Sequence, residues 1–199
     1  MNQTIQLSTP LTEEAMRKLR VNDVVALSGT VYTARDMAHL KLREMQEKGE
    51  RLPENFGGSV VFHAGPVARK TDKTYSILAI GPTTSIRMEP HSDFMGRLGV
   101  KAIVGKGGLG DGSLKAFQQY GMVYLLAAPG CGVLHAEAVK AVQRVHWLEE
   151  MGMPEAIWVL EVSNWGPLIV GMDSRGNSIF QTIKEEGLKK LDRLVREWK

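Results

Sequence analysis

The sequence predicts an α/β fold with a mostly parallel sheet and flanking helices. From Val21 onward, short β-branched apolar runs alternate with longer amphipathic stretches, and glycine or proline separates them. This alternation is typical of strand–helix units, in which helices cover parallel strands. The length of 199 residues suits one domain. We expect residues 1–199 to form a single domain, because the loop at residues 49–58 is not a convincing linker.

The chain is expected to begin with an extended segment and a short helix within residues 1–20. Thr12 opens that helix, and Glu13 and Glu14 lie in its first turn. Short apolar runs bounded by glycine or proline then indicate buried strands. They predict strands at 24–27, 60–63, 77–80, 102–104, 123–127, 157–162 and 168–170.

Longer stretches between these runs predict the helices. Helices are expected at 34–48, 86–98, 114–120, 134–151 and 182–198. Gly121 and Gly152 follow two of them at the position where glycine commonly ends a helix. The segment from Asp173 to Gly176 is typical of a hairpin turn. The last helix is amphipathic and basic, and we expect it to dock loosely.

The composition excludes a disulfide scaffold and favours a cytoplasmic protein. Cys131 is the only cysteine, so no intrachain disulfide can form. No apolar run reaches the length of a membrane span, and the first residues lack the features of a signal peptide. We expect no nucleic-acid partner, because no basic stripe with interleaved aromatic residues occurs. The small net charge of +3 still permits an acidic small molecule as substrate.

Two strand-to-helix turns share a pattern, in which hydroxyl residues precede an arginine in the first helical turn. One turn spans residues 27–36 and contains Arg35, and the other spans 80–88 and contains Arg87. Helix N-termini bind anions, and the guanidinium fork matches a carboxylate, although the helix dipole disfavours arginine there. The simpler alternative is a purely structural role, in which Thr33 and Ser85 only cap the N-termini of helices. Two such turns together favour a shared anion site.

Residues 105–113 form a glycine-rich loop after a predicted strand. The loop contains the dinucleotide pattern G-x-G-x-x-G, but the next strand is not followed by the acidic residue that would hold a ribose. It is not a Walker A loop, because glycine follows Lys106. Glycines here would let Lys106 project into a site. A flexible surface loop is an equally good interpretation of this segment.

His39 lies four residues after Arg35 and three after Asp36, so the three can share one helix face. His39 could carry a proton, with Asp36 supporting its charge. The simpler alternative is that His39 is a buried, hydrogen-bonded histidine without a catalytic role. The other histidines show no metal-binding spacing, and Cys131 is more typical of a small buried hydrophobic residue than of a nucleophile.

Several ordered segments carry a family resemblance that covers most of the chain. They are 23–36 with His39, His63–Pro66, Gly81–Met88, Val104–Gly107 and Gly152–Trp158. With these segments, the chain resembles the β-subunit of iron–sulfur hydro-lyases, namely class I fumarate hydratases and L(+)-tartrate dehydratases. The same module forms the C-terminal domain of single-chain class I fumarases.

The resemblance implies a swivelling β/β/α domain that closes over a [4Fe–4S] cluster. Three cysteines bind such a cluster, so this chain with its one cysteine cannot build it alone. The resemblance therefore implies a cluster-bearing α-subunit as partner, within a higher oligomer of αβ pairs.

The resemblance also implies roles for individual residues. Thr83 matches a proposed proton-abstracting base, and His39 matches a histidine proposed to be catalytic. Arg35, Arg87 and Lys106 match residues that bind the substrate carboxylates, and we place Thr84 with them.

The resemblance implies the reversible hydration of fumarate to L-malate as the reaction. Two alternatives stay open. One is the dehydration of L-tartrate to oxaloacetate, which segments 129–133 and 146–147 favour. The other is a non-catalytic module that uses residues 105–110 to bind a nucleotide.

Overall fold

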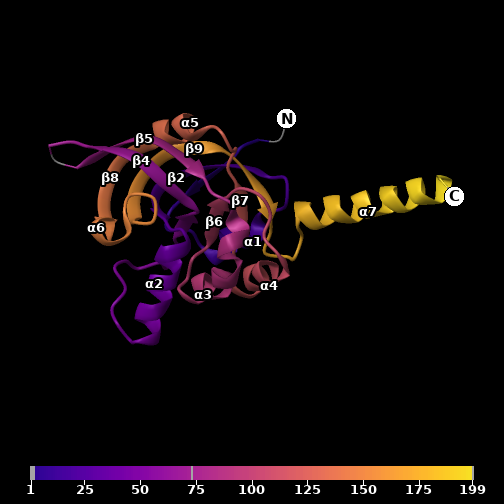
Figure 1. Cartoon of the computed structure of the whole chain (residues 1–199), viewed down its shortest axis with the longest axis horizontal. Helices are drawn as coiled ribbons and strands as arrows, with labels where there is room; N and C mark the ends of the chain where they lie inside the picture. The colour runs from indigo at the N-terminus through magenta and orange to yellow at the C-terminus, as the bar shows by residue number, and fades with distance from the viewer. Residues whose placement is uncertain (1–2, 73, 199) are drawn as a thin grey trace.

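Five strands of the described chain close into a barrel (Figure 1). The computed structural model describes residues 3–72 and 74–198. The barrel strands pair in the order β2 (Val24–Thr33), β3 (Val60–Phe62), β6 (Ala102–Gly105), β7 (Val123–Leu126) and β9 (Ile157–Met172). Because β9 then pairs with β2, the barrel has no open edge at this point.

Other strands and the helices surround this barrel. β1 (Ile5–Ser8) lies beside β2, and β8 (Val139–His146) lies beside β9. β4 (Ala64–Lys70) and β5 (Tyr75–Pro82) form a separate antiparallel hairpin. The helices are α1 (Glu13–Lys18), α2 (Asp36–Glu47), the 3-10 helix η1 (Ser85–His91), α3 (Ser92–Arg97), α4 (Asp111–Tyr120), α5 (Gly132–Glu137), α6 (Leu148–Met151) and α7 (Ile179–Glu197).

The prediction of a swivelling β/β/α domain with a mostly parallel sheet and flanking helices is wrong. β1, β2, β3, β6 and β7 are parallel to one another, but β9 is antiparallel to β2, β7 and β8. The two apolar runs at 157–162 and 168–170 are parts of this one strand of 16 residues. It continues through Asn164, whose φ is 50°, and closes the sheet into a mixed barrel.

The helix predicted at 134–151 is also wrong, because most of that segment is β8. Apolar residues recur there at Val139, Val142 and Val145, which is a helical spacing of three. Two register shifts against β9 interrupt the alternation of the strand. Each shift is typical of a β-bulge, which moves the next side chain to the other face. The valines can therefore pack on one side without a helix.

A helix cap, a helix end and a turn that the sequence predicts are confirmed. Thr12 accepts a hydrogen bond from the N–H of Ala15 at 3.2 Å and so caps α1. Gly121 ends α4 in the left-handed conformation with φ of 61°. Asp173 accepts a hydrogen bond from the N–H of Arg175 at 2.9 Å, which closes the predicted turn. Such signals are readable from sequence because each depends on contacts within a few residues.

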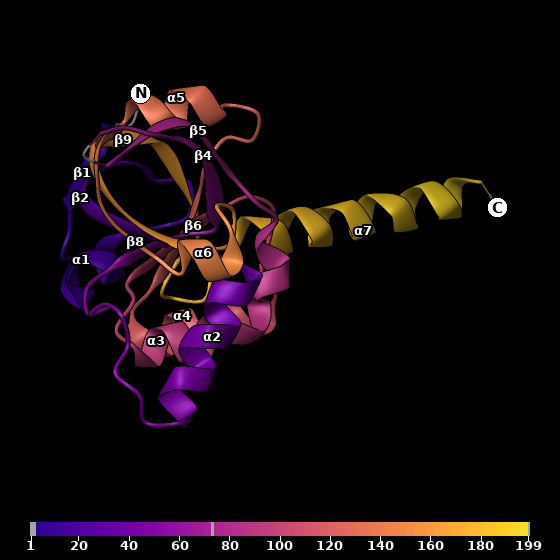
Figure 2. The same cartoon turned by 60° about the vertical axis from the view of Figure 1, so that its left-hand side comes forward.

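The core has two layers that follow the alternation of side chains along the strands. Val25, Leu27 and Val31 of β2 belong to the cluster inside the barrel. Tyr32 of the same strand belongs to a second cluster, in which the barrel packs against α2, α3 and α4. These three helices lie on one side of the barrel, while α5 lies at the other end (Figure 2).

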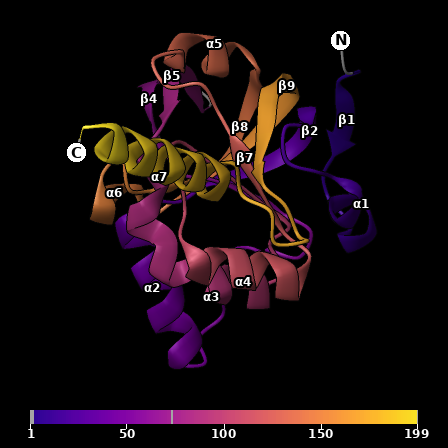
Figure 3. The same ribbon diagram turned by 90° about the vertical axis from the view of Figure 1, so that its right-hand side faces the viewer.

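The last helix, α7, projects away from the body of the molecule (Figure 1), and it lies in front of the body in the view of Figure 3. Leu188, Leu191 and Leu194 are each more than half exposed along it. This arrangement agrees with the expected loose docking. Among the residues that the structure describes, no helix combines the length and apolar character needed to cross a membrane.

Candidate functional site

The two arginine turns predicted from the sequence meet in space. Arg87 Nη2 lies 3.1 Å from Asp36 Oδ2 and donates a hydrogen bond to Thr83 Oγ1 at 2.9 Å. Asp36 directly follows Arg35 at the start of α2. The turn after β2 and the turn after β5 are therefore in contact, which is the arrangement that a shared anion site would need.

Strand order explains why these segments meet. β2, β3 and β6 are parallel neighbours, so their carboxyl ends lie at one edge of the barrel. Past those ends, the Ala34 N–H donates to Phe62 O at 3.0 Å and the His63 N–H donates to Val104 O at 2.8 Å. The N–H of Thr83 then donates to His63 O at 2.7 Å. Backbone hydrogen bonds therefore align the site segments side by side.

Lys106 follows β6 and joins the same edge. Thr84 pairs with Lys106 in a parallel bridge, and the Ser85 N–H donates to Lys106 O at 3.1 Å. Five of the six predicted site residues thus lie on adjoining segments: Arg35, Thr83, Thr84, Arg87 and Lys106. The Arg87 side chain is 44% exposed, so this edge is an open surface.

Glu155, which the sequence did not single out as a site residue, holds the start of α2. Its Oε1 lies 3.1 Å from Arg35 Nε, and its Oε2 accepts a hydrogen bond from the Met37 N–H at 3.0 Å. The contact with Arg35 is an ion pair without hydrogen-bond geometry at Nε. Glu155 falls within the Gly152–Trp158 segment that carries the family resemblance, and this is the signal that could have found it.

The capping interpretation of Thr33 and Ser85 is wrong. Thr33 lies in β2, where its hydroxyl donates to Ala156 O at 3.2 Å and accepts from the Trp158 N–H at 2.9 Å. Thr33 therefore ties β2 to β9. The residues that precede α2 and η1 are Arg35 and Thr84, and neither makes a side-chain capping bond. Ser85 is fully buried and faces the interior instead.

The glycine-rich loop is shaped by contacts within the protein. The Glu89 carboxylate accepts hydrogen bonds from the N–H groups of Gly110 and Ser113, at 2.8 and 2.9 Å, and so occupies the start of α4. A Cβ on Gly108 would lie 2.9 Å from the Phe180 ring. The helix start that a nucleotide phosphate would use is therefore filled by a carboxylate of the chain itself.

His39 is fully buried and belongs to a cluster of three histidines. Its Nδ1 lies 2.7 Å from Arg35 O, and its ring centroid lies 5.4 Å from that of His63 and 5.2 Å from that of His91. Burial lowers the pKa of His39 to about 4 and also lowers the pKa values of His63 and His91. All three rings are therefore neutral at pH 7, and no sequence pattern predicted that His39 would stack on His91 and meet His63 edge to face.

The histidine cluster predicts that stability declines in mildly acidic solution. The folded state keeps the rings neutral, whereas the unfolded chain takes up protons near pH 6.5. The contribution of the neutral rings to the free energy of unfolding should be fully present above about pH 6.5. It should decrease as the pH falls toward 4, by on the order of 3 kcal/mol for His39. Urea unfolding at a series of pH values measures how the free energy of unfolding depends on pH.

Replacing His39 with glutamine gives the comparison for that experiment. The His39→Gln chain should be less stable at pH 7 but should lose less stability between pH 7 and 5. An unfolding free energy of the wild-type chain that stays constant from pH 7 to 4.5 would contradict a neutral buried cluster.

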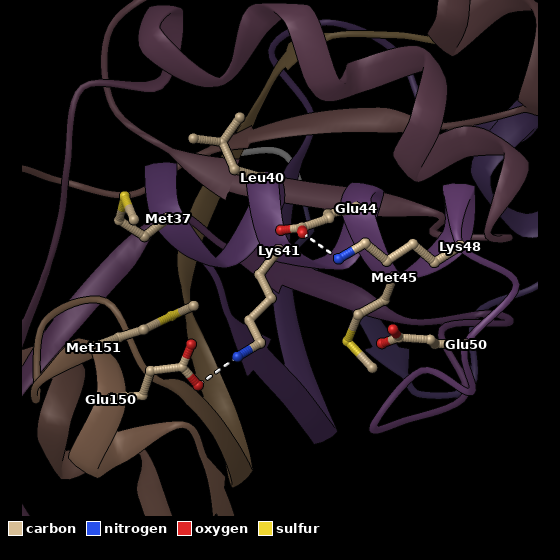
Figure 4. A pocket seen from close by; sticks show the side chains of 9 residues that line it. All are labelled: Met37, Leu40, Lys41, Glu44, Met45, Lys48, Glu50, Glu150 and Met151. Atoms are coloured by element: carbon tan, nitrogen blue, oxygen red, sulfur yellow. Dashed lines mark hydrogen bonds and ion pairs between the residues drawn. The ribbon is translucent and has the colours of Figure 1, made fainter.

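A pocket of about 380 Å³ opens beside α2, toward α6 (Figure 4). Lys41 reaches across it and forms an ion pair with Glu150. Its walls also include the sulfur-bearing side chains of Met37, Met45 and Met151. None of the six predicted site residues lines this pocket, so it is distinct from the arginine site.

Comparison with known proteins adds to this geometry. The family model described as fumarase C-terminus matches residues 1–183. The chain belongs to the fumarase C-terminus family. It is 48% identical over 186 residues to a Methanocaldococcus jannaschii protein provisionally named L(+)-tartrate dehydratase subunit beta, covering 93% of this chain and 95% of the relative. It is 38% identical over 192 residues to the L(+)-tartrate dehydratase subunit beta of Escherichia coli K12, covering 96% and 94%.

A longer relative contains the fumarase C-terminus module as one part. A Geobacillus stearothermophilus protein provisionally named fumarate hydratase class I is 41% identical over 189 residues. The match covers 94% of this chain but 35% of that relative. Members of the fumarase C-terminus family thus occur both as a separate chain and within a larger one.

Proposed function

We propose that this chain is the β-subunit of a hydro-lyase that reversibly hydrates fumarate to L-malate. The observation that carries the proposal is the contact of Arg87 with both Thr83 and Asp36, which joins the two arginine turns. A four-carbon dicarboxylate needs a cationic clamp for each carboxylate and a proton acceptor between them. Arg35, Arg87 and Lys106 supply the cations, and Thr83 supplies the hydroxyl.

In this proposal, the deprotonated Thr83 Oγ1 takes the proton from the carbon atom when malate is dehydrated, while the hydroxyl group of malate leaves as hydroxide and is protonated to water. A threonine hydroxyl is by itself a poor base. Arg87 donates a hydrogen bond to Thr83 Oγ1, and its positive charge favours the deprotonated oxygen. In the hydration direction, the same oxygen returns the proton to carbon. Thr84, beside Lys106, contributes to binding the carboxylate.

A catalytic role for His39 stays a prediction. The ring is fully buried, and its Nδ1 faces the carbonyl oxygen of Arg35, so its direct effect in this structure is on the start of α2. Its Nε2 is buried and without a hydrogen-bond partner among the described residues. Proton transfer by His39 requires a rearrangement that brings Nε2 to the substrate.

The residues of this chain do not fit a [4Fe–4S] cluster. Cys131 is the single cysteine, and no group of three His, Cys, Asp or Glu residues in the described part of the chain is placed to hold a metal ion. We therefore assign the cluster to a partner α-subunit in a cytoplasmic oligomer of αβ pairs. The open surface around Arg87 suits a site that a second chain completes.

L-Tartrate dehydration is the second candidate function. The relatives that match this chain over almost their whole length are named tartrate dehydratase β-subunits. Tartrate also carries two carboxylates on a four-carbon chain, so the same arginine and lysine clamps can bind it. Turnover of both substrates by the assembled enzyme separates the two candidates.

The purified chain is expected to be colourless and inactive on fumarate, malate and tartrate. Anaerobic assembly with a cluster-bearing partner should produce activity, because the partner supplies the chemistry that this chain lacks. Exposure to air should then abolish that activity. The ultraviolet absorbance of the fumarate double bond measures the rate with fumarate or malate, and the rate of oxaloacetate formation measures the reaction of tartrate. Full activity from this chain alone, unaffected by iron chelators, is the result that rejects the two-chain proposal.

A further inference from the structure

Tyr124 lies behind two loops that carry four of the six predicted site residues, namely Thr83, Thr84, Arg87 and Lys106. Its side chain is fully buried on β7, and its hydroxyl lies 2.9 Å from Ser85 Oγ and 3.0 Å from Gly107 O. Ser85 belongs to the turn that contains Thr83 and Arg87, and Gly107 directly follows Lys106. One hydroxyl group therefore contacts both loops from the inside.

The two loops fit each other closely at this point. The Ser85 N–H donates to Lys106 O at 3.1 Å, and Ser85 Oγ also lies 2.9 Å from His63 Nδ1. A Cβ on Gly105 would lie 1.9 Å from Ser85 Oγ and 3.0 Å from the Tyr124 hydroxyl. The glycine at position 105 is therefore required by this packing, which explains part of the glycine-rich pattern without any nucleotide.

We propose that Tyr124 is a positioning residue that fixes Lys106 relative to Thr83 through its contacts with Gly107 and Ser85. The proposal rests on the proposed function of those two residues. Tyr124 has no exposed surface and cannot touch substrate, so it acts only through the loops. Burial raises the pKa of its hydroxyl, which keeps the group protonated as a hydrogen-bond donor. Displacement of a site residue by about 1 Å can cost about 100-fold in rate.

Tyr124→Phe removes only the hydroxyl, and Tyr32→Phe is its matched control. Tyr32 lies in the same core cluster, and its hydroxyl is 3.5 Å from Asn55 O, away from both loops. In the assembled enzyme, Tyr124→Phe should lower kcat by about 10- to 100-fold. Tyr32→Phe should leave kcat within about twofold of wild type, since it removes a buried hydroxyl without moving the site. Equal kcat values for the two variants would overturn the proposal.

A double-mutant cycle tests whether Tyr124 acts through Ser85. If it does, Tyr124→Phe combined with Ser85→Ala should lower kcat by less than the product of the two single losses, because each variant removes the contact between Tyr124 and Ser85. Losses of kcat that multiply would show that the two residues act independently, and would overturn the assigned route.

Amide hydrogen exchange of the full chain gives a readout that does not depend on catalysis. Tyr124→Phe should speed exchange in residues 83–87 and 105–109 together, and Tyr32→Phe should change neither segment. If the wild-type pair shows no hydro-lyase activity, the proposed function fails while exchange still decides the positioning contact. Unchanged exchange in both segments of Tyr124→Phe would overturn the positioning role.

Discussion

Replacing Arg87 with methionine is expected to lower kcat/KM of the assembled enzyme. The decrease should correspond to a loss of about 2–5 kcal/mol in the free energy of transition-state binding. Arg87 donates to Thr83 Oγ1 and lies 3.1 Å from Asp36, so its loss removes one carboxylate clamp and leaves the Asp36 charge unbalanced near the substrate. Methionine keeps most of the side-chain volume without the charge. Steady-state kinetics with fumarate and malate measure the effect.

Stability provides the check on that result. Arg87 is 44% exposed and its ion pair is at the surface, where such pairs contribute about 0–1 kcal/mol, so the unfolding free energy of the chain should change little. Arg97→Met is the matched control, because Arg97 is an exposed arginine on α3 that pairs with Asp93 of the same helix. Arg87→Lys should restore part of the activity. A nearly native kcat/KM for Arg87→Met would remove Arg87 from the site.

Replacing Thr83 with valine is expected to lower kcat by about 100- to 10,000-fold, the range over which a positioned acid or base contributes. Valine has nearly the shape of threonine but lacks the hydroxyl, so it can neither accept nor return the proton. The carboxylate clamps at Arg35, Arg87 and Lys106 remain, and KM should therefore change far less than kcat. Rapid-mixing and steady-state assays in both reaction directions separate the two constants.

Thr83→Ser distinguishes chemistry from packing. Serine keeps the oxygen within reach of Arg87 Nη2, so this variant should retain a substantial part of the activity. Equal activity of Thr83→Val and wild type would mean that Thr83 only supports Arg87 and that the base lies elsewhere. A parallel measurement on His39→Gln shows whether the buried histidine affects kcat at all.

Local features of the fold were predictable because their causes are local. The Thr12 cap, the glycine that ends α4 and the turn closed by Asp173 each depend on neighbours a few residues away. The convergence of the arginine turns was predictable for a related reason, since strand–turn–helix patterns place side chains at the ends of strands. Arg87 and Asp36 confirm that convergence with their 3.1 Å contact.

Features that depend on distant strands were not predictable in the same way. β8 carries valines at a helical spacing, and only its bulged pairing with β9 makes it a strand. The mixed barrel likewise requires that β9 pair with β2 far along the chain. Contacts of Glu155 with Arg35 and of Glu89 with the start of α4 also join separate elements.

By itself, the sequence determined the chemical groups of the site and the turns that present them. Arginine, lysine and threonine at strand ends already predict a binding surface for carboxylates. The tertiary structure alone decided that His39 is buried in a neutral cluster, and that Gly105 and Gly108 make room for Ser85 and Phe180. The reason is physical: burial and close packing arise from which distant surfaces meet, and a linear pattern does not contain that information.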